Sequence, residues 1–214
     1  MVKVKRSFPA PTSLSKQKSY SEVDVVRQLK EDFDNKCYIC NIDNLPEGVI
    51  EHLRPHKDGI YVDLKYDWEN LFLSCRHCNS VKNKKIYEYK IIDCCKVDPE
   101  QYLIFNHIEE NVTVKSLDDT DEDAVSTSKL ITEVFNVSNT GHYTVNSEER
   151  RDRLQNEMNK LYKYLQRHKN NPDSKPILRT LKVLLQRKSP FAAFKRSYIR
   201  QNKEAYPNLQ YLII

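Results

Sequence analysis

The sequence CRHCNSVKNKK, residues 75–85, places two cysteines two residues apart directly before a basic segment. A matching pair lies upstream in CYIC, residues 37–40, with 34 residues between the two pairs. Two residues between thiols let both sulfur atoms face one ion, and two such turns supply four thiolates for tetrahedral zinc. The spacing therefore predicts structural zinc; buried free thiols or redox chemistry are the alternatives. The predicted ligands are Cys37, Cys40, Cys75 and Cys78.

A site filled by four cysteines leaves no open position for chemistry. We therefore expect its zinc to hold the two turns together and to contribute to folding. The neighbours Cys94 and Cys95 are too close together to form another such unit, and we interpret them as ordinary buried thiols.

The charge of the 214-residue chain is +5 and is unevenly distributed. Residues 1–20 contain five lysines and arginines and no acidic residue, and Pro9 and Pro11 exclude a regular helix there. We expect an extended basic arm, more a solvated tail than a partner-binding segment. With only three glycines, a glycine-rich phosphate loop is excluded. No long apolar run or secretory signal is visible, so we expect a cytoplasmic protein.

The hydrophobic patterning predicts an α+β fold. A helix from Ser21 to before Asn35 precedes two strands, in GVIEHL (48–53) and ENLFLSC (69–75), and a short basic helix over 76–85. Two further strands, 102–106 and 112–116, resemble a hairpin. The remaining helices are expected through 124–136, 147–168, 177–188 and 191–206.

In this order of elements the region from Cys37 to Lys85 resembles the HNH nuclease family, which has a ββα-metal fold. The resemblance rests on Glu51-His52 in the first strand, Asn70-Leu71 in the second, and Asn79 directly after the last cysteine. The fold it implies is a zinc-stapled ββα-metal core with an N-terminal basic arm and helix and a mainly helical C-terminal half.

The resemblance also implies roles for these residues. His52 would be the general base that takes a proton from the attacking water. Glu51 and Asn79 would hold a catalytic Mg²⁺ or Mn²⁺ ion, which stabilises the charge developing on the phosphate. Asn70 would fix the loop between the strands and so orient the histidine. The family more often has Asp where Glu51 stands, and the extra methylene moves the carboxylate by about 1.5 Å.

Basic side chains around this constellation are candidates for contacts with phosphates, because the charge run directly follows the predicted site. A merely solvated face is the alternative. For His56, phosphate binding and simple exposure are both open, and we expect His77 to face solvent. The predicted nucleic-acid contacts are Arg54, Arg76, Lys82, Lys84 and Lys85.

A narrower resemblance joins residues 50–85 to DPEQYLIF (98–105) and to the helix beginning NSEERRDRL. Together they are similar to PtuB-type nucleases of Septu and retron-associated systems, which act in anti-phage defence beside an ABC/SMC-like ATPase. The implied substrate is DNA or a structured RNA, and the implied partner is such an ATPase. The apolar end LQYLII (209–214) suits docking to a partner or packing on the chain's own helices.

The expected organisation is therefore a basic arm (1–20), an HNH nuclease domain with its leading helix (21–92), and a hairpin with a helical domain (93–214). A metal-dependent endonuclease is the leading hypothesis. A catalytically silent, zinc-stapled adaptor that binds nucleic acid is the alternative, and a redox or zinc sensor is a third. An adaptor would not need Glu51, His52, Asn70 and Asn79 together.

Overall fold

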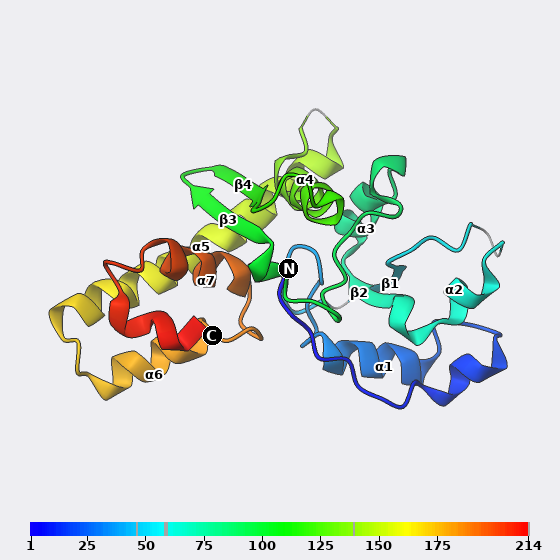
Figure 1. The fold of residues 1–214 in the computed structure, drawn as a ribbon, viewed down its shortest axis with the longest axis horizontal. Helices are drawn as coiled ribbons and strands as arrows, with labels where there is room; N and C mark the ends of the chain where they lie inside the picture. Colours follow the sequence, from blue (N-terminus) through cyan, green and yellow to red (C-terminus); the bar gives the residue numbers. More distant parts are fainter. Residues whose placement is uncertain (46, 58–59, 139, 214) are drawn as a thin grey trace.

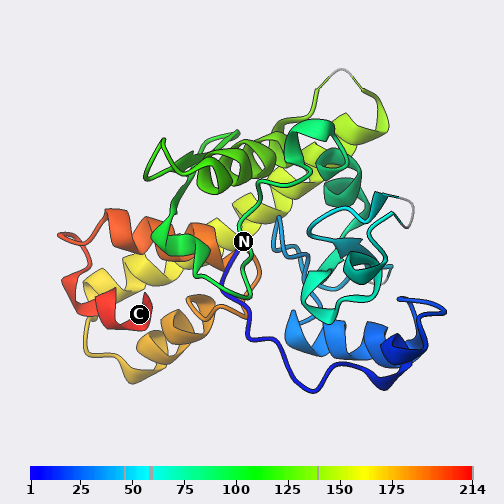
Figure 2. The same cartoon turned by 45° about the vertical axis from the view of Figure 1, so that its right-hand side comes forward.

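In the computed structural model, which describes residues 1–45, 47–57, 60–138 and 140–213, two small sheets are surrounded by helices (Figures 1 and 2). In chain order the first half contains η1 (Thr12–Lys16), α1 (Val23–Asp32), β1 (Val49–His52), α2 (Val62–Tyr66), η3 (Trp68–Asn70), β2 (Leu71–Ser74), α3 (Arg76–Lys82) and η4 (Lys85–Tyr87). The second half contains η5 (Pro99–Gln101), β3 (Leu103–Ile108), β4 (Asn111–Ser116), α4 (Glu122–Asn136), α5 (His142–Asn170), α6 (Lys175–Leu184), α7 (Ala192–Gln201) and η6 (Pro207–Ile213).

The first sheet and α3 form the predicted ββα unit. Strands β1 and β2 are antiparallel, with Glu51 opposite Phe72 and His52 opposite Leu71. All four residues of β2 are buried, and the Phe72 ring packs against Phe33 of the segment after α1 at a centroid distance of 5.6 Å. The core of this half therefore forms between β2 and α1, which leaves the outer edge of β1 for the site.

The N-terminal arm is not the solvated tail that its charge suggested. Val2, Val4 and Arg6 are buried, whereas Lys5 is exposed and half-buried Lys3 donates from Nζ to the Cys95 carbonyl at 2.8 Å. The Arg6 guanidinium donates hydrogen bonds of 2.9 Å to the carbonyls of Trp68 and Leu71. The alternation of apolar and basic residues in MVKVKR is the sequence pattern that indicates this burial, because an extended segment with alternating apolar residues buries one face.

The second half is a hairpin covered by helices, as predicted. Strands β3 and β4 pair from Leu103–Ser116 to Ile108–Asn111, α4 packs along β4, and α7 packs on β3. Phe194 of α7 meets the Phe105 and Phe135 rings at centroid distances of 5.3 and 5.5 Å. Helix α5 begins at His142, five residues before its predicted start at Ser147.

The apolar C-terminal end packs largely on its own helices. Leu209 and Ile213 of η6 are buried, whereas Tyr211 is exposed; Ile214 lies outside the described residues. Part of LQYLII therefore packs on the chain's own helices, and its docking to a partner stays a prediction. The division of the chain at residues 20 and 92 stays a prediction. Over the described ranges, no helix is long and apolar enough to cross a membrane.

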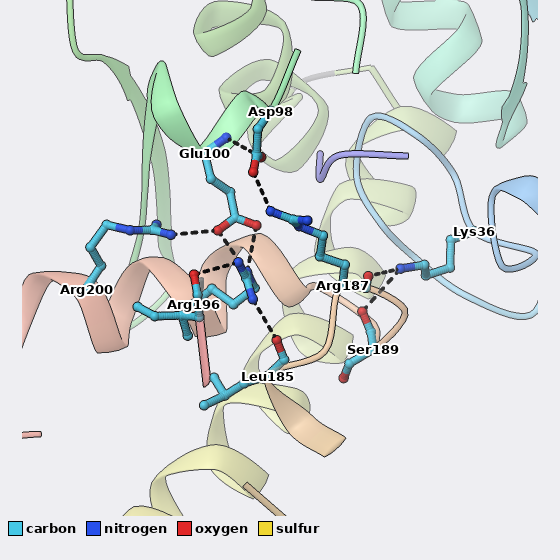
Figure 3. A network of polar contacts seen from close by, with 9 residues as sticks. Lys36, Asp98, Glu100, Leu185, Arg187, Ser189, Arg196 and Arg200 are labelled. Carbon is cyan, nitrogen blue, oxygen red and sulfur yellow. Dashed lines mark hydrogen bonds and ion pairs between the residues drawn. The ribbon is translucent and has the colours of Figure 1, made fainter. Parts of the chain in front are cut away.

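A buried polar network fixes the C-terminal helices (Figure 3). Glu100 of η5 accepts hydrogen bonds of 2.8 Å from Arg196 and 2.9 Å from Arg200, both on α7. Arg196 also donates to the carbonyls of Leu185 and Ile213, so all three nitrogens of its guanidinium are engaged. One ion pair thus connects α6, α7, η5 and the chain end.

Removing the charge of Glu100 should destabilise the protein, because it leaves the buried Arg196 without its counter-ion. We expect Glu100→Gln to lower the free energy of unfolding by about 3–5 kcal/mol, measured by urea denaturation. Glu110→Gln, at an exposed position of the β3–β4 hairpin, is the matched control and should change it by less than about 0.5 kcal/mol. Equal stability of the two variants would contradict a structural role for the pair.

Candidate metal centre and catalytic cleft

The two cysteine pairs meet in one buried cluster. The sulfur atoms of Cys37, Cys40, Cys75 and Cys78 lie within 4.8 Å of one another. Cys75 is the N-cap of α3, and its sulfur accepts a hydrogen bond of 3.4 Å from the amide of Cys78. Four soft donors at this separation can surround a single ion, and this donor set fits Zn²⁺.

A cation from the C-terminal half contacts this cluster. Arg150 of α5 is buried, and its Nη2 donates to Cys75 Sγ at 3.1 Å. A metal held by four thiolates carries net negative charge, which an adjacent guanidinium stabilises in a buried setting. No sequence motif predicts this place for Arg150, because 71 residues separate it from the last cysteine of the cluster.

His77 is buried, contrary to the expectation that it faces solvent. Its Nε2 lies 2.9 Å from the carbonyl oxygen of Val134 on α4. The prediction was wrong because helix α3 packs on α4 through the side that carries His77. Cys94 is buried and Cys95 half-buried, as expected for ordinary thiols, and neither belongs to the four-cysteine cluster.

A cleft of about 450 Å³ lies beside β1 and α3. It brings together side chains from the N-terminal arm, the first strand, the following loop and the helix. Three of the four predicted catalytic residues line it. The lining includes Tyr20, Glu51, His52, His56, Asn79 and Lys82.

His52 is held in this cleft in a defined protonation state. Its Nε2 lies 3.0 Å from the carbonyl oxygen of Lys65, and because a carbonyl only accepts, Nε2 carries the proton. Burial lowers the pKa of His52 to about 4, so the ring is neutral at pH 7. Nδ1 is then the nitrogen that can accept a proton.

Aromatic rings fix the plane of this imidazole. The rings of Tyr20 and His56 lie at centroid distances of 4.7 and 4.6 Å from His52, both in edge-to-face geometry. Tyr20 stands before α1, outside the HNH-like region, and no motif pointed to it. His56 is half-buried beside the candidate base, rather than simply exposed.

Asn70 makes the contacts expected of a residue that fixes the loop. It is buried, and its Oδ1 accepts from the Arg54 amide at 2.8 Å. Its Nδ2 donates to the carbonyls of Arg54 and Leu64, at 2.9 and 2.8 Å. Leu64 directly precedes Lys65, whose carbonyl binds His52. Asn70 therefore couples the end of β1 to the segment that orients the imidazole.

Glu51 forms a buried ion pair. Its Oε1 lies 2.7 Å from Lys82 Nζ, and its Oε2 accepts from the Tyr38 hydroxyl at 2.8 Å. Burial raises the pKa of Glu51 above its usual value, and Lys82 opposes that rise. Each carboxylate oxygen therefore has one hydrogen-bond partner and keeps one lone pair, and Glu51 lies in the lining of the cleft. A divalent ion would have to share this carboxylate with Lys82 and Tyr38, and the predicted ligand role of Glu51 stays a prediction.

Lys82 was predicted to lie on an exposed basic face of α3, but it is buried in its ion pair with Glu51. It lies three residues after Asn79, and residues at that spacing share a helix face. This face turns toward β1 and the cleft, so Lys82 is buried, while half-buried Asn79 keeps its place in the cleft lining. The spacing could have revealed this placement, because only one face of a short packed helix meets solvent.

The other predicted phosphate contacts differ in availability. Arg54 is half-buried, with Asp123 at 3.6 Å and the Ile91 carbonyl at 3.2 Å. Exposed Arg76 faces Glu47 at 3.2 Å. Lys84 pairs with Glu133, and Lys85 is exposed. The cations outside the cleft are therefore largely engaged with carboxylates of this chain, and their contact with phosphates stays a prediction.

Comparisons with known proteins agree with the geometry of this region. Residues 37–85 match the model of the HNH endonuclease family. The chain is also similar to the Septu protein PtuB of Bacillus mycoides (strain KBAB4), at 28% identity over 120 residues. That alignment covers 41% of this chain and 40% of the relative, so the match spans well under two thirds of the relative's length. No solved structure matches the chain.

The Glu51–Lys82 pair can be tested by removing the charge of Lys82 alone and then the charges of both residues. We expect Lys82→Met to lower the free energy of unfolding by about 3–5 kcal/mol, because Glu51 is left buried and uncompensated. The loss should shrink as the pH falls, since the carboxyl group then takes up a proton. Lys85→Met, three residues away and exposed, is the control. The double variant Glu51→Gln/Lys82→Met should recover part of the stability; no recovery would contradict a direct pair.

Proposed function

Because residues 37–85 form an HNH endonuclease domain, we propose that the protein is a metal-dependent endonuclease that hydrolyses phosphodiester bonds in nucleic acid. One observation carries the proposal: a neutral histidine in a cleft, with Nε2 bound to the Lys65 carbonyl and Nδ1 left to accept a proton. A base of this kind is what the attack of water on a phosphate requires.

In the proposed reaction His52 Nδ1 takes the proton of the water that attacks phosphorus. Asn70 keeps the imidazole in place through the loop, and Tyr20 and His56 restrict its rotation. A divalent ion, Mg²⁺ or Mn²⁺, would supply stabilisation of the charge that develops on the phosphate. Its two predicted ligands, Glu51 and Asn79, both line the cleft, and each carboxylate oxygen of Glu51 already has one hydrogen-bond partner, Lys82 or Tyr38.

The four-cysteine cluster is proposed to hold structural zinc rather than a catalytic ion. All four positions are filled by sulfur, all four cysteines are buried, and Arg150 lies against the cluster. The metal would join the turn before β1 to the first turn of α3, and so fix the two elements that border the cleft.

The similarity to a Septu protein supports a role in defence against phage. We propose that the nuclease acts in the cytoplasm together with an ABC/SMC-like ATPase, as the resemblance implies, with DNA or a structured RNA as its substrate. A silent adaptor in such a complex is the second candidate. The observation that favours the adaptor is Glu51, whose charge is already neutralised by Lys82.

The nuclease proposal predicts a large effect of His52 on cleavage. In assays with DNA and RNA, with Mg²⁺ or Mn²⁺ and with or without the ATPase, His52→Ala should reduce cleavage by about 10²–10⁴-fold. The cause is loss of the proton acceptor. His142→Ala, at an exposed histidine on α5, should cleave like the parent. Equal cleavage by both variants would refute the mechanism, and no cleavage by the parent under any condition would favour the adaptor.

The zinc proposal predicts a metal content of one zinc per chain, measured by elemental analysis. Cys37→Ser should lose the metal and unfold at a lower temperature, because metal binding contributes to folding. Cys94→Ser is a matched control, since Cys94 is equally buried but lies outside the cluster, and it should keep its zinc. Retention of full metal content by Cys37→Ser would contradict this site.

A further inference from the structure

The positive charge of the chain is concentrated in its C-terminal helices. Residues 158–203 contain 13 lysines and arginines and one acidic residue, Asp173, for a net charge of +12. The rest of the chain contains 22 basic and 29 acidic residues, for a net charge of −7. The overall value of +5 therefore conceals a strongly basic segment within an acidic protein.

Part of this charge serves the fold. Lys195 is bound to Glu157, Arg196 and Arg200 are bound to Glu100, and Arg187 is bound to Asp98. Figure 3 shows Arg187, Arg196 and Arg200 of this group with the carboxylates that hold α7 and the segment before it in place. Lys195 and Arg196 are buried, whereas Arg187 and Arg200 are partly exposed but bound to carboxylates.

Most of the remaining cations lie on the outer faces of α5 and α6. On α5, Lys160, Lys163 and Arg167 are exposed at spacings of three and four residues, which places them on one face. On α6, the exposed Lys175, Arg179 and Lys182 follow the same rule. We call these six side chains the basic hairpin, since α5 and α6 pack against each other.

The cations of the basic hairpin have few partners within the protein. Among the described residues, only Lys160 of the six lies within salt-bridge distance of a carboxylate, that of Glu157. Mutual repulsion of uncompensated like charges disfavours the free protein, and a polyanion would relieve it.

The surface around the basic hairpin has few of the exposed apolar side chains that protein interfaces bury. Of the large apolar side chains described over residues 158–203, Val183 alone is exposed. Stable protein interfaces are enriched in aromatic residues and depleted in lysine at their centre. A lysine-rich face without apolar anchors instead fits the sugar–phosphate backbone of nucleic acid, which basic side chains recognise through charge.

We propose that the basic hairpin is a second nucleic-acid-binding surface, separate from the HNH cleft, that binds the phosphodiester backbone without reading sequence. The inference rests on the proposed nuclease function. The C-terminal half of α5 and α6 lie on the opposite side of the molecule from β1 and β2 in both views (Figures 1 and 2). The hairpin therefore holds substrate beyond the scissile phosphate, and supplies free cations where those near the cleft are largely paired with carboxylates.

The test measures binding without cleavage. In a His52→Ala background, the affinity for a DNA duplex and for an RNA duplex of equal length is determined across a salt series. The variant Lys175→Gln/Arg179→Gln/Lys182→Gln should bind about 10-fold or more weakly, and its log–log salt slope should be shallower by about 2–3, because three phosphate contacts are lost. The two duplexes distinguish DNA from RNA as the source of the backbone.

The matched control removes the same charge elsewhere, at the exposed Lys16, Lys115 and Lys129. Both triple variants should unfold at the parent's temperature. A second variant on α5, Lys160→Gln/Lys163→Gln/Arg167→Gln, should repeat the loss of binding.

Equal loss in the control, no loss in both hairpin variants, or no binding of either duplex by the parent would each overturn the proposal. So would unchanged nucleic-acid binding together with lost binding of the ATPase. If binding follows the expectation but the protein with His52 intact never cleaves, the nuclease proposal fails and the binding surface stands.

Discussion

The meeting of two cysteine pairs is the constraint on which the rest of this structure depends. It fixes the turn before β1 against the first turn of α3, across 34 intervening residues that contain both strands of the first sheet. The four sulfur atoms lie close together in a buried cluster, and a tetrahedral metal held by them, as proposed, would tolerate little displacement. The cleft lies between the elements fixed in this way, and Arg150 extends the same constraint to α5.

Two buried ion pairs are the second feature that holds the elements of the molecule together. Glu51 and Lys82 join β1 to α3 beneath the cleft, and Glu100 and Arg196 join η5 to α7 in the other half. Each pair is stable only while both members are present, since a single buried charge is strongly unfavourable. Such pairs select one arrangement of neighbouring elements, which apolar packing alone would specify less sharply.

Buried and paired charges also limit how strongly the cleft can attract a charged substrate. The groups around His52 are neutral or already paired, and burial keeps the imidazole uncharged at neutral pH. If the protein cleaves nucleic acid as proposed, attraction of the polyanionic substrate depends on cations elsewhere, and the exposed faces of α5 and α6 carry such cations. The two proposals together divide the chemistry and the electrostatic attraction between two parts of one chain.

The sequence by itself determined the local arrangement: the four-cysteine cluster from its two-residue spacings, the ββα order and the β3–β4 hairpin. These follow from short-range geometry, which few residues specify. The place of Asn70 in the loop came from the family resemblance. The tertiary structure alone decided which face of α3 is buried, and therefore that Lys82 neutralises Glu51 and that His77 binds the Val134 carbonyl. It also decided that the start of the basic arm buries one face, with Arg6 bound to the Trp68 carbonyl. Burial depends on partners distant in the chain, and charge pattern alone does not identify them.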